Sequence, residues 1–363
     1  MIVKKLERNW KRACFKAIFA YLHLRAGAPV PPDWSEGRRK VLFMRPDGIG
    51  DAMVSTPLLR GITAISPDLR LHAIGSPANA PFLRRLDYLE RVYVFDKRDR
   101  GAIVRLGASL HRERYDVVID PRLNERSMTG LILMLAARAP LRMGVAGRDV
   151  DSDLTVSVPP GEGHITETLA GFAVPFGLDP AGIDWRPTLP LTEPERERAD
   201  GYWAKVSGTT ASRRLLINIS AGESPRKWPE ARFVEIIDAA RSARPDLAIA
   251  IVGAPPEWES VRDVAKATGG FAVPTPSLGD LTAIVATSDV VFTPDTCVVH
   301  IAAAFGRPTV AMYLKGTSLR WGAFGVAGAN LESADGTLLS LPTESVLTSL
   351  LPLLESPATA DRS

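Results

Sequence analysis

The sequence predicts an α/β protein built from two doubly wound domains in tandem. From about residue 39 onward, short apolar runs typical of strands alternate with helical stretches, and this alternation implies a mostly parallel sheet covered on both faces. The alternation breaks over residues 179–212, which contain four prolines and a charged run, and then restarts. The chain has 363 residues, and because single cores rarely grow past ~250–300 residues, two domains are expected.

Hydrophobic periodicity and turn residues place the elements. In the first half we expect strands at 40–45, 71–74, 92–95 and 115–120 and helices at 52–65, 81–86 and 128–138. In the second half we expect strands at 215–219, 247–252, 271–273, 290–292 and 309–313, helices at 229–242, 257–267, 278–287 and 341–354, and a short helix stopped by Gly306. Ligands of doubly wound sheets bind outside the carboxyl ends of the strands, so we expect the ligand in a crevice between the two sheets.

These elements divide the chain into five segments. They are a basic amphipathic N-terminal helix and linker (1–38), an N-terminal doubly wound domain (39–185), an interdomain linker (186–212), a C-terminal doubly wound domain (213–340), and a C-terminal helix and tail (341–363).

The basic character of the chain belongs to its N-terminus. Residues 1–40 carry ten Lys or Arg against three acidic residues, a charge of +7, and because the whole chain carries +3, the remainder carries −4. The uninterrupted apolar run Ala17–Leu22 is far shorter than the ~20 residues that span a bilayer, and no signal peptide is expected. A basic helix with Trp10 and Phe15 can lie on an anionic membrane surface; the alternative is a helix that packs on the body of the protein.

The bulk composition describes a soluble globular protein, with 45% hydrophobic and 23% charged residues. Its two cysteines, Cys14 and Cys297, are far apart and form no cluster with metal-ligand spacing, so neither a disulfide framework nor a zinc site is indicated. A reducing cytosol fits this usage. We expect no metal, no cofactor and no nucleic-acid partner.

The turn after the first strand, residues 45–52, contains Gly48 and Gly50, which let the backbone approach a ligand. It is not a dinucleotide fingerprint, because Met53 stands where a third glycine or alanine belongs and no acidic residue ends the second strand. Two carboxylates remain, Asp47 and Asp51. Asp51 can cap the following helix or can act as a general base facing the crevice.

The corresponding turn of the second domain, residues 218–229, places Arg226 and Lys227 before a helix that begins near Pro229. Free backbone N–H groups and a point charge make this turn a plausible phosphate cradle. Arg226 can instead lie in a solvated loop, and Lys227, next to Trp228, is the stronger candidate. The sequence has no G-x-x-x-x-G-K-[ST] loop, so nucleoside triphosphate hydrolysis is not expected.

A third polar turn follows the strand at 290–292. Asp295 or Thr296 can cap the next helix while facing a ligand, and His300 lies one turn further. The alternative is an ordinary turn with an Asp or Thr cap and a half-buried histidine.

These three turns, in this order, resemble glycosyltransferase family 9, the ADP-heptose:lipopolysaccharide heptosyltransferases, from about Lys40 to Leu354. The matching pieces are 45–51 with 56–60, 115–120, 164–178, 227–229 with 232–233, and 295–296 with 300–306. The resemblance implies a GT-B fold of two Rossmann-like domains that face a central cleft. It also implies an inverting, metal-independent transfer, with the nucleotide-diphosphate sugar held by the C-terminal domain.

The resemblance also implies roles for single residues. Asp51 looks like the general base, and Lys227 looks like the cation that neutralises the leaving diphosphate. Donor-binding residues on that pattern are Ser220, Lys227, Glu257 (with Glu259 as a competing choice at the ribose), Asp295, Thr296 and His300. The candidates for binding the acceptor are Asp47, Arg122, Asn124 and Arg126. Alternatively, the last three are exposed to solvent at the start of a helix and bind no acceptor.

The sequence departs from the family pattern at two places. Cys297 follows Asp295-Thr296 where a glycine is usual, and Val298 comes next where a proline or leucine is usual, which narrows the space around the donor sugar. Glu223 places an acid in the phosphate turn, where a diphosphate tolerates it only if the side chain faces away.

We therefore expect a glycosyltransferase that moves a sugar, heptose from ADP-heptose, onto a lipopolysaccharide core or related glycolipid acceptor. Its N-terminal helix would place it on the cytoplasmic face of the inner membrane as a peripheral protein. Two alternatives remain open: a catalytically silent GT-B module that binds a nucleotide sugar or membrane, and a nucleotide-sugar 2-epimerase of the same fold.

Overall fold

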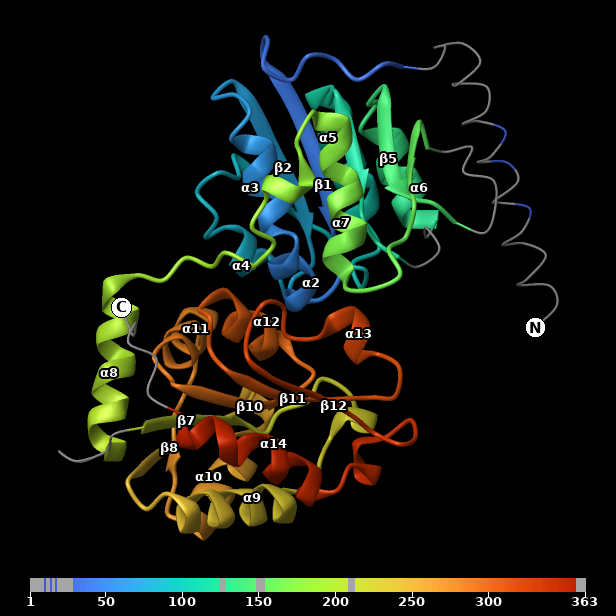
Figure 1. Cartoon of the computed structure of the whole chain (residues 1–363). Coiled ribbons are helices and arrows are strands. Elements are labelled where there is room, and N and C mark those ends of the chain that lie inside the picture. The colour runs from blue at the N-terminus through green and yellow to red at the C-terminus, as the bar shows by residue number, and fades with distance from the viewer. Residues whose placement is uncertain are drawn as a thin grey trace. The chain divides into compact units, whose positions relative to one another are not determined.

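The computed structural model describes residues 29–123, 128–147, 154–207 and 213–356, together with Trp10, Cys14 and Ala17. The chain divides into two compact units, Met1–Trp185 and Arg186–Ser363 (Figure 1). Most of the predicted basic N-terminal helix lies outside the described residues.

Unit 1 alternates strands and helices from Arg39 onward. Its strands are β1 (Arg39–Arg45), β2 (Leu69–Gly75), β3 (Arg91–Val94), β4 (Val117–Asp120), β5 (Leu141–Val145) and β6 (Val156–Val158). Its helices are α2 (Ile49–Val54), α3 (Thr56–Thr63), α4 (Ala80–Leu83), α5 (Ala102–Glu113), α6 (Met128–Ala136) and α7 (Ile165–Ala173).

Unit 2 repeats this plan. Its strands are β7 (Arg213–Asn218), β8 (Leu247–Val252), β9 (Phe271–Ala272), β10 (Val290–Pro294), β11 (Thr309–Tyr313) and β12 (Gly328–Glu332). Its helices are α8 (Glu193–Ser207), α9 (Glu230–Ala243), α10 (Trp258–Thr268), α11 (Leu278–Ala286), α12 (Cys297–Ala304), α13 (Ser318–Trp321) and α14 (Thr343–Glu355).

The two sheets have the same topology. Over the described residues, the strand order is β3-β2-β1-β4-β5-β6 in unit 1 and β9-β8-β7-β10-β11-β12 in unit 2, and every paired neighbour is parallel. This is the doubly wound 3-2-1-4-5-6 order. The strand order reverses between β1 and β4 and between β7 and β10, and these switch points are where such sheets bind ligands. The predicted α/β class with two doubly wound domains is confirmed.

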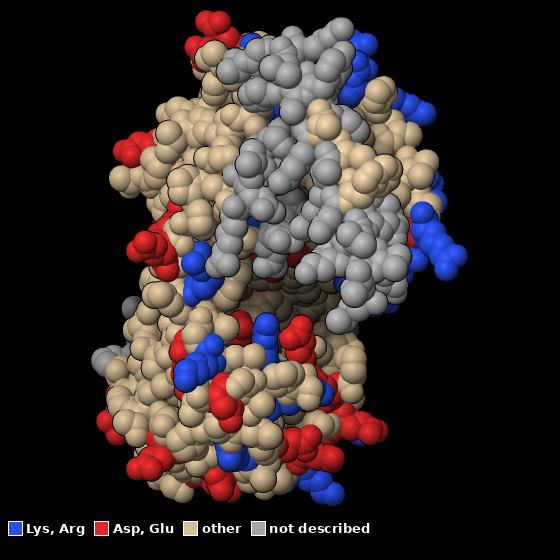
Figure 2. All heavy atoms as spheres, turned by 90° about the vertical axis from the view of Figure 1, so that its right-hand side faces the viewer, with Lys and Arg blue, Asp and Glu red and all other residues tan. Residues whose placement is uncertain are grey.

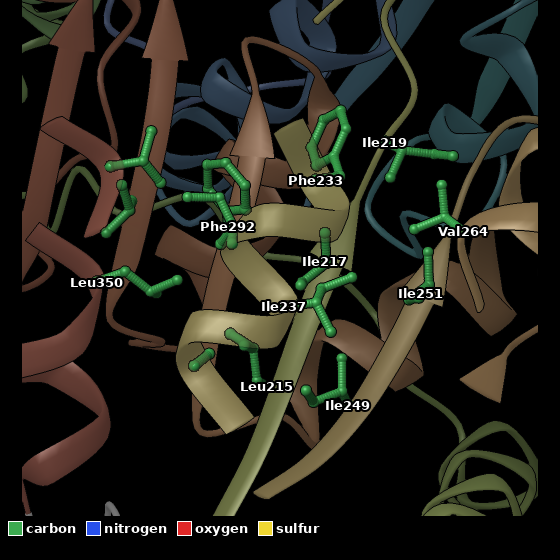
Figure 3. Packing of buried hydrophobic residues seen from close by; sticks show 14 of the residues in the cluster. Leu215, Ile217, Ile219, Phe233, Ile237, Ile249, Ile251, Val264, Phe292 and Leu350 are labelled. Atoms are coloured by element: carbon green, nitrogen blue, oxygen red, sulfur yellow. The ribbon is translucent and has the colours of Figure 1, made fainter. Parts of the chain in front are cut away.

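Burial explains the strands. The central strands are continuous apolar runs because helices cover both faces of each sheet. In unit 2, α9, α10 and α14 lie on one face and α11 and α12 on the other (Figure 1). Figure 3 shows Phe233 and Ile237 of α9 pointing at Ile217 of β7 and Phe292 of β10.

Trp228 links this core to the turn before α9. Its ring is 4% exposed and packs edge-on against Phe233 and Phe292, with centroids 5.1 and 5.9 Å away. Its Nε1 donates a hydrogen bond to the carbonyl of Leu341 at 3.2 Å. The turn that carries Lys227 is therefore fixed to the interior of unit 2.

The charged surface of unit 2 is mixed. On the face that Figure 2 shows, acidic and basic side chains of this unit alternate over the visible surface. Such a distribution is typical of a solvated protein face.

The helix predicted over 52–65 is two helices in the structure, separated at Ser55. Pro57 has no N–H to donate to the carbonyl of Met53, and the Thr56 hydroxyl donates to that carbonyl instead, at 2.7 Å. The proline therefore ends the first helix and begins the second.

Several elements were not predicted. The structure adds α5, β5, β6, α7, α8, α13 and β12. α8 lies inside the stretch expected to be a linker; it is highly charged, but Ala199 and Trp203 are buried, and Trp203 Nε1 donates to Thr287 Oγ1 at 2.9 Å. β12 alternates between exposed and partly buried residues at the sheet edge, so no apolar run marks it.

Trp228→Ala should lower the free energy of unfolding by about 3–5 kcal/mol, because it opens a cavity beside Phe233 and Phe292 and leaves a carbonyl without its donor. Urea denaturation followed by circular dichroism measures this. Leu319→Ala, at a side chain that is 68% exposed, serves as the control and should change stability by less than about 0.5 kcal/mol. Equal effects of the two substitutions would contradict the anchoring role of Trp228.

Candidate functional site

The predicted site residues that the structure describes gather at the carboxyl edges of the two sheets. In unit 1, Asp47 and Asp51 follow β1 and Arg122 follows β4. In unit 2, Ser220 and Lys227 follow β7, Glu257 follows β8, and Asp295 and Thr296 follow β10. Each set therefore lies at or beside the topological switch point of its own sheet.

A buried guanidinium organises the edge of unit 1. The side chain of Arg45, the last residue of β1, is only 2% exposed. It donates from Nε to the carbonyl of Asp51 and from Nη2 to Asp51 Oδ1, both at 3.0 Å, and its Nη1 lies 3.5 Å from Asp47 Oδ2. Because a buried charge is costly unless paired, Asp51 is the main partner that holds Arg45 in the interior, and Asp47 adds a weaker contact.

Asp51 is held from two sides. Its Oδ1 accepts from Arg45, and its Oδ2 accepts from the backbone N–H of Gly48 at 3.2 Å, at the start of α2. The structural role that the sequence left open is therefore present: Asp51 satisfies a free N–H at the helix start. The carboxyl is also 28% exposed, so this anchoring leaves part of it accessible.

The same turn is fixed by the segment between β2 and α4. Asn79 is fully buried, and its Nδ2 donates to the carbonyl of Arg45 at 2.7 Å and to those of Asp47 and Gly48 at 3.2 Å. The hydroxyl of Ser76 donates to the Asp47 carbonyl at 2.9 Å. The backbone that carries the two carboxylates is therefore held by the turn between β2 and α4.

Arg122 pairs with the end of β4. Its guanidinium binds both carboxylate oxygens of the buried Asp120, with Nε 2.7 Å from Oδ1. Arg122 side-chain exposure is 21%, so its charge lies at the edge of the sheet and not in open solvent. Asn124 and Arg126, the other residues predicted for the acceptor, lie outside the described residues.

Asp47 differs from Asp51 in its surroundings. Burial, reinforced by the charge of Asp51, raises the pKa of Asp47 to about 6, although Arg45 and Arg122 favour its ionised form. Its Oδ1 is buried and has no hydrogen-bond partner among the described residues. The turn therefore carries one fully partnered carboxylate and one with an unused oxygen.

In unit 2, a buried asparagine joins the two turns of the switch point. Nδ2 of Asn218, at the end of β7, donates to Thr293 Oγ1 at 2.9 Å and to Thr296 Oγ1 at 3.1 Å, while Oδ1 accepts from Ser220 N–H at 3.1 Å. Thr296 caps α12, since its Oγ1 accepts from the N–H of Val298 at 3.3 Å. The Asn218 side chain thus sets the positions of Ser220 and Thr296 together.

Ser220 connects this turn to the next strand. Its hydroxyl accepts a hydrogen bond from the N–H of Ala254, after β8. Gly253 is required beside it, because a Cβ there would lie 2.6 Å from a methyl group of Val261 and 3.0 Å from Ser220 Oγ. Glu223 is exposed at the start of the short helix Ser224–Arg226.

Two ion pairs hold the cations of unit 2. Lys227 Nζ lies 3.0 Å from Glu257 Oε1, and Arg226 Nη1 lies 3.4 Å from Asp295 Oδ2. Arg226 also donates to the carbonyl of Asp295 at 3.4 Å. Arg226 is therefore fixed beside Asp295 and does not extend into solvent as a loop residue would, which was the alternative considered from the sequence. Lys227 is more exposed than its partner, at 58% against 20%.

The helix α12 carries the remaining predicted residue. His300 lies on α12 and is only 5% exposed, so most of its surface contacts protein. Cys297 begins the helix, and burial raises the pKa of its thiol to about 11. The thiol is therefore neutral near pH 7 and is no nucleophile there.

Comparison with known proteins identifies the family. The model of glycosyltransferase family 9 (heptosyltransferase) matches residues 103–343, more than half of the chain. The chain belongs to glycosyltransferase family 9. It is a glycosyltransferase of the heptosyltransferase type, as the sequence predicted. The matched residues include every predicted donor-side position but begin after the turn of Asp47 and Asp51.

Relatives of this family 9 transferase cover most of its length. It is 23% identical over 295 residues to lipopolysaccharide heptosyltransferase 2 of Salmonella typhimurium, spanning 76% of this chain and 82% of that protein. A family 9 glycosyl transferase from Veillonella parvula has a TM-score of 0.72 at 18% identity and covers 87% of this chain and 97% of its own. An E. coli heptosyltransferase solved with ADP has a TM-score of 0.62 at 19% identity, covering 85% and 98%. At these identities, the two structures show a shared fold.

Sequence reasoning missed several members of the transferase's site. They are Arg45, Asn79, Asp120, Asn218 and Thr293. An arginine inside the apolar run of β1 was the available signal for Arg45, because such a charge must find a buried partner. The others follow only from the order of the strands.

Two further observations concern the described part of the chain. No group of three or more His, Cys, Asp or Glu side chains there is arranged to hold a metal ion. None of its helices combines the length and the apolar character needed to cross a membrane.

Asp47→Asn should stabilise the transferase near pH 7.5 by on the order of 1–2 kcal/mol, since each unit of raised pKa corresponds to about 1.4 kcal/mol and the carboxyl is partly exposed. The sign follows from the pKa. Because Asp47 titrates at about 6 when folded and near 4 when unfolded, ionisation costs stability as the pH rises through this range.

Urea denaturation from pH 4 to 8 measures this effect. The advantage of Asp47→Asn should shrink as the pH falls toward 4. Asp68→Asn, at an exposed carboxylate of the same unit, is the charge-matched control and should show little difference at any pH. A constant difference between Asp47→Asn and the parent chain would contradict the raised pKa.

Proposed function

We propose that this transferase moves heptose from ADP-heptose onto a lipopolysaccharide core or a related glycolipid acceptor, with inversion at the anomeric carbon and without a metal ion. The observation that carries the proposal is the opposite chemistry of the two switch points. Carboxylates fixed by Arg45 lie at one, and Arg226 and Lys227 lie at the other.

The reaction needs both kinds of group. An acceptor hydroxyl forms a bond to the anomeric carbon while the bond from that carbon to the diphosphate oxygen breaks, and the electron pair leaves with the diphosphate. In the proposal Asp51 takes the proton of the hydroxyl, and Lys227 neutralises the charge that develops on the leaving group. Lys227 and Arg226 supply this charge without a metal ion.

The donor site of the proposal is built by unit 2. Lys227 exchanges Glu257 for the diphosphate, and Glu257 is then available to accept hydrogen bonds from the ribose hydroxyls. Ser220, Thr296 and the start of α12 line the phosphates, and Asp295 and His300 lie on the sugar side. ADP in the E. coli heptosyltransferase structure supports an ADP-linked donor for this chain.

The acceptor site of the proposal is built by unit 1. Asp47 and Arg122 lie beside Asp51 at the same switch point, and Asn124 and Arg126 follow in sequence. Cationic and amide side chains suit an acidic core sugar. The basic N-terminal segment would hold the enzyme on the cytoplasmic face of the inner membrane, where a glycolipid acceptor is available.

The two other functions considered from the sequence receive less support. A silent module has no use for a carboxylate as carefully positioned as Asp51 or for an accessible Lys227. A nucleotide-sugar 2-epimerase of the same fold needs no acceptor, and the family match favours sugar transfer.

Calorimetric titration with ADP, UDP and GDP, with and without EDTA, tests the proposed donor. Tight binding of ADP that is indifferent to EDTA is expected. A preference for UDP or GDP would replace the donor sugar, and binding to none of the three would leave the silent module as the better account.

Lys227→Ala should weaken the binding of ADP at least about tenfold, because the diphosphate loses its most accessible cation. The same titration measures this. Lys266→Ala removes the same charge from an exposed position of α10 and should leave ADP affinity unchanged. Unchanged affinity in Lys227→Ala would remove this residue from the phosphate site.

Asp51→Ala should lower the transfer rate by about 10²–10⁴-fold and leave ADP affinity nearly unchanged, because a general base acts in the transition state. The measurement is heptose transfer from ADP-heptose to Kdo-terminated lipid A, paired with calorimetry. An equal loss of ADP binding would show that Asp51 only supports the fold of its turn.

A further inference from the structure

The two carboxylates of the β1–α2 turn are partnered unequally. Both oxygens of Asp51 are engaged, one by the guanidinium of Arg45 and one by the N–H of Gly48. Asp47 has one oxygen 3.5 Å from the same guanidinium, and its buried Oδ1 has no partner within the described part of the chain. A buried oxygen without a partner is costly, so this atom is suited to receive a proton.

Arg45 brings the two carboxylates into one electrostatic unit. One guanidinium contacts both, and the charge of Asp51 acts on the ionisation of Asp47. When two carboxyls lie beside one cation, the negative charge of one disfavours ionisation of the other. The two groups then gain and lose protons as a coupled pair. When the environments of such a pair differ, the group whose pKa is higher holds the proton.

We infer that the proton which Asp51 withdraws from the acceptor hydroxyl comes to rest on Asp47, so that the two carboxyls work as one base. The inference rests on the proposed function and deepens it. In the balanced step, the acceptor oxygen bonds to the anomeric carbon, the diphosphate leaves with its electron pair, and the hydroxyl proton passes through Asp51 to Asp47 Oδ1. It returns to water after the products leave.

The surroundings of Asp47 are consistent with this role. The charged groups that face it are Arg45 from β1, Asp51 from α2, and Arg122 after β4, whose own charge is matched by Asp120. From the β2–α4 segment, Ser76 and Asn79 bind its backbone carbonyl and not its carboxyl group. The raised pKa of Asp47, about 6, fits a carboxyl that takes up a proton during turnover.

The test compares pH–rate profiles for transfer from ADP-heptose to Kdo-terminated lipid A between pH 4.5 and 8.5. In the parent enzyme, kcat should fall on the acid side with a midpoint near 6, leaving about a tenth of the plateau rate at pH 5. In Asp47→Asn the plateau should be about tenfold lower, because the proton that Asp51 takes up has no second carboxyl on which to rest. The limb with a midpoint near 6 should be absent from this variant, because the group that titrates there has been removed.

Two controls separate this role from a structural one. Asp68→Asn should keep the parent profile, and Asp47→Asn should keep the ADP affinity and thermal melting behaviour of a folded protein. Carbon-13 NMR of labelled aspartate carboxyls gives a readout independent of activity. A resonance that titrates near 6 should be present in the parent chain and absent from Asp47→Asn. Asp47→Ser is a second neutral variant if the asparagine variant folds poorly.

The outcomes are distinct. Absence of transfer by the parent enzyme at pH 8 would overturn the proposed function. Transfer by the parent enzyme, with an acid limb that stays near 6 in Asp47→Asn or with an unchanged plateau, would overturn the role of Asp47 alone. A resonance near 6 that persists in Asp47→Asn would do the same.

Discussion

Arg45 ends β1 with almost none of its surface in contact with water, and its charge must be balanced inside the protein. The carboxylate of Asp51 supplies most of the balance, Asp47 adds a weaker contact at 3.5 Å, and Asn79 holds the backbone that carries both. Removing a partner from a buried charge typically costs several kcal/mol, so the turn has few alternatives to its observed conformation. The position of Asp51, and with it the base of the proposed reaction, depends on this interaction.

The two units use the same topology with different electrostatics. In unit 1 the charged groups at the switch point are fixed to a buried cation and to backbone N–H groups. In unit 2 the cations pair with acids from other elements, and the Lys227–Glu257 pair is partly in solvent. Exposed ion pairs contribute little to stability, so their side chains can leave one another to bind a ligand. The buried contacts of Arg45 remain in place. A fixed base and exchangeable cations suit a transferase that binds and releases a diphosphate in each turnover.

The sequence predicted most of the central strands, because buried parallel strands such as β1, β8 and β10 are continuous apolar runs. It did not predict β12, whose side chains alternate in exposure, or β5, which includes Arg142.

For the site, the polar turns marked Asp51, Lys227 and Thr296 correctly as positions at the carboxyl edges. Their partners could not be found in this way. Asn79 lies 34 residues from Arg45 and Thr293 lies 75 residues from Asn218, so these contacts exist only once the strand order is known. The difference between Asp47 and Asp51 depends on burial, which no spacing of residues reveals.

The anchoring of Trp228 also has an entropic consequence for its neighbour. The backbone N–H of Lys227 is bonded to the carbonyl of Ser224 at 3.0 Å, and the next residue is packed in the core. The loop is thus already ordered before a ligand arrives, and only the four side-chain torsions of the lysine remain to be restricted. That restriction costs about 1.5–2 kcal/mol, whereas ordering a flexible loop of several residues would cost about 1–2 kcal/mol for each of them. Most of the conformational entropy that phosphate binding would otherwise cost is therefore already lost when unit 2 folds.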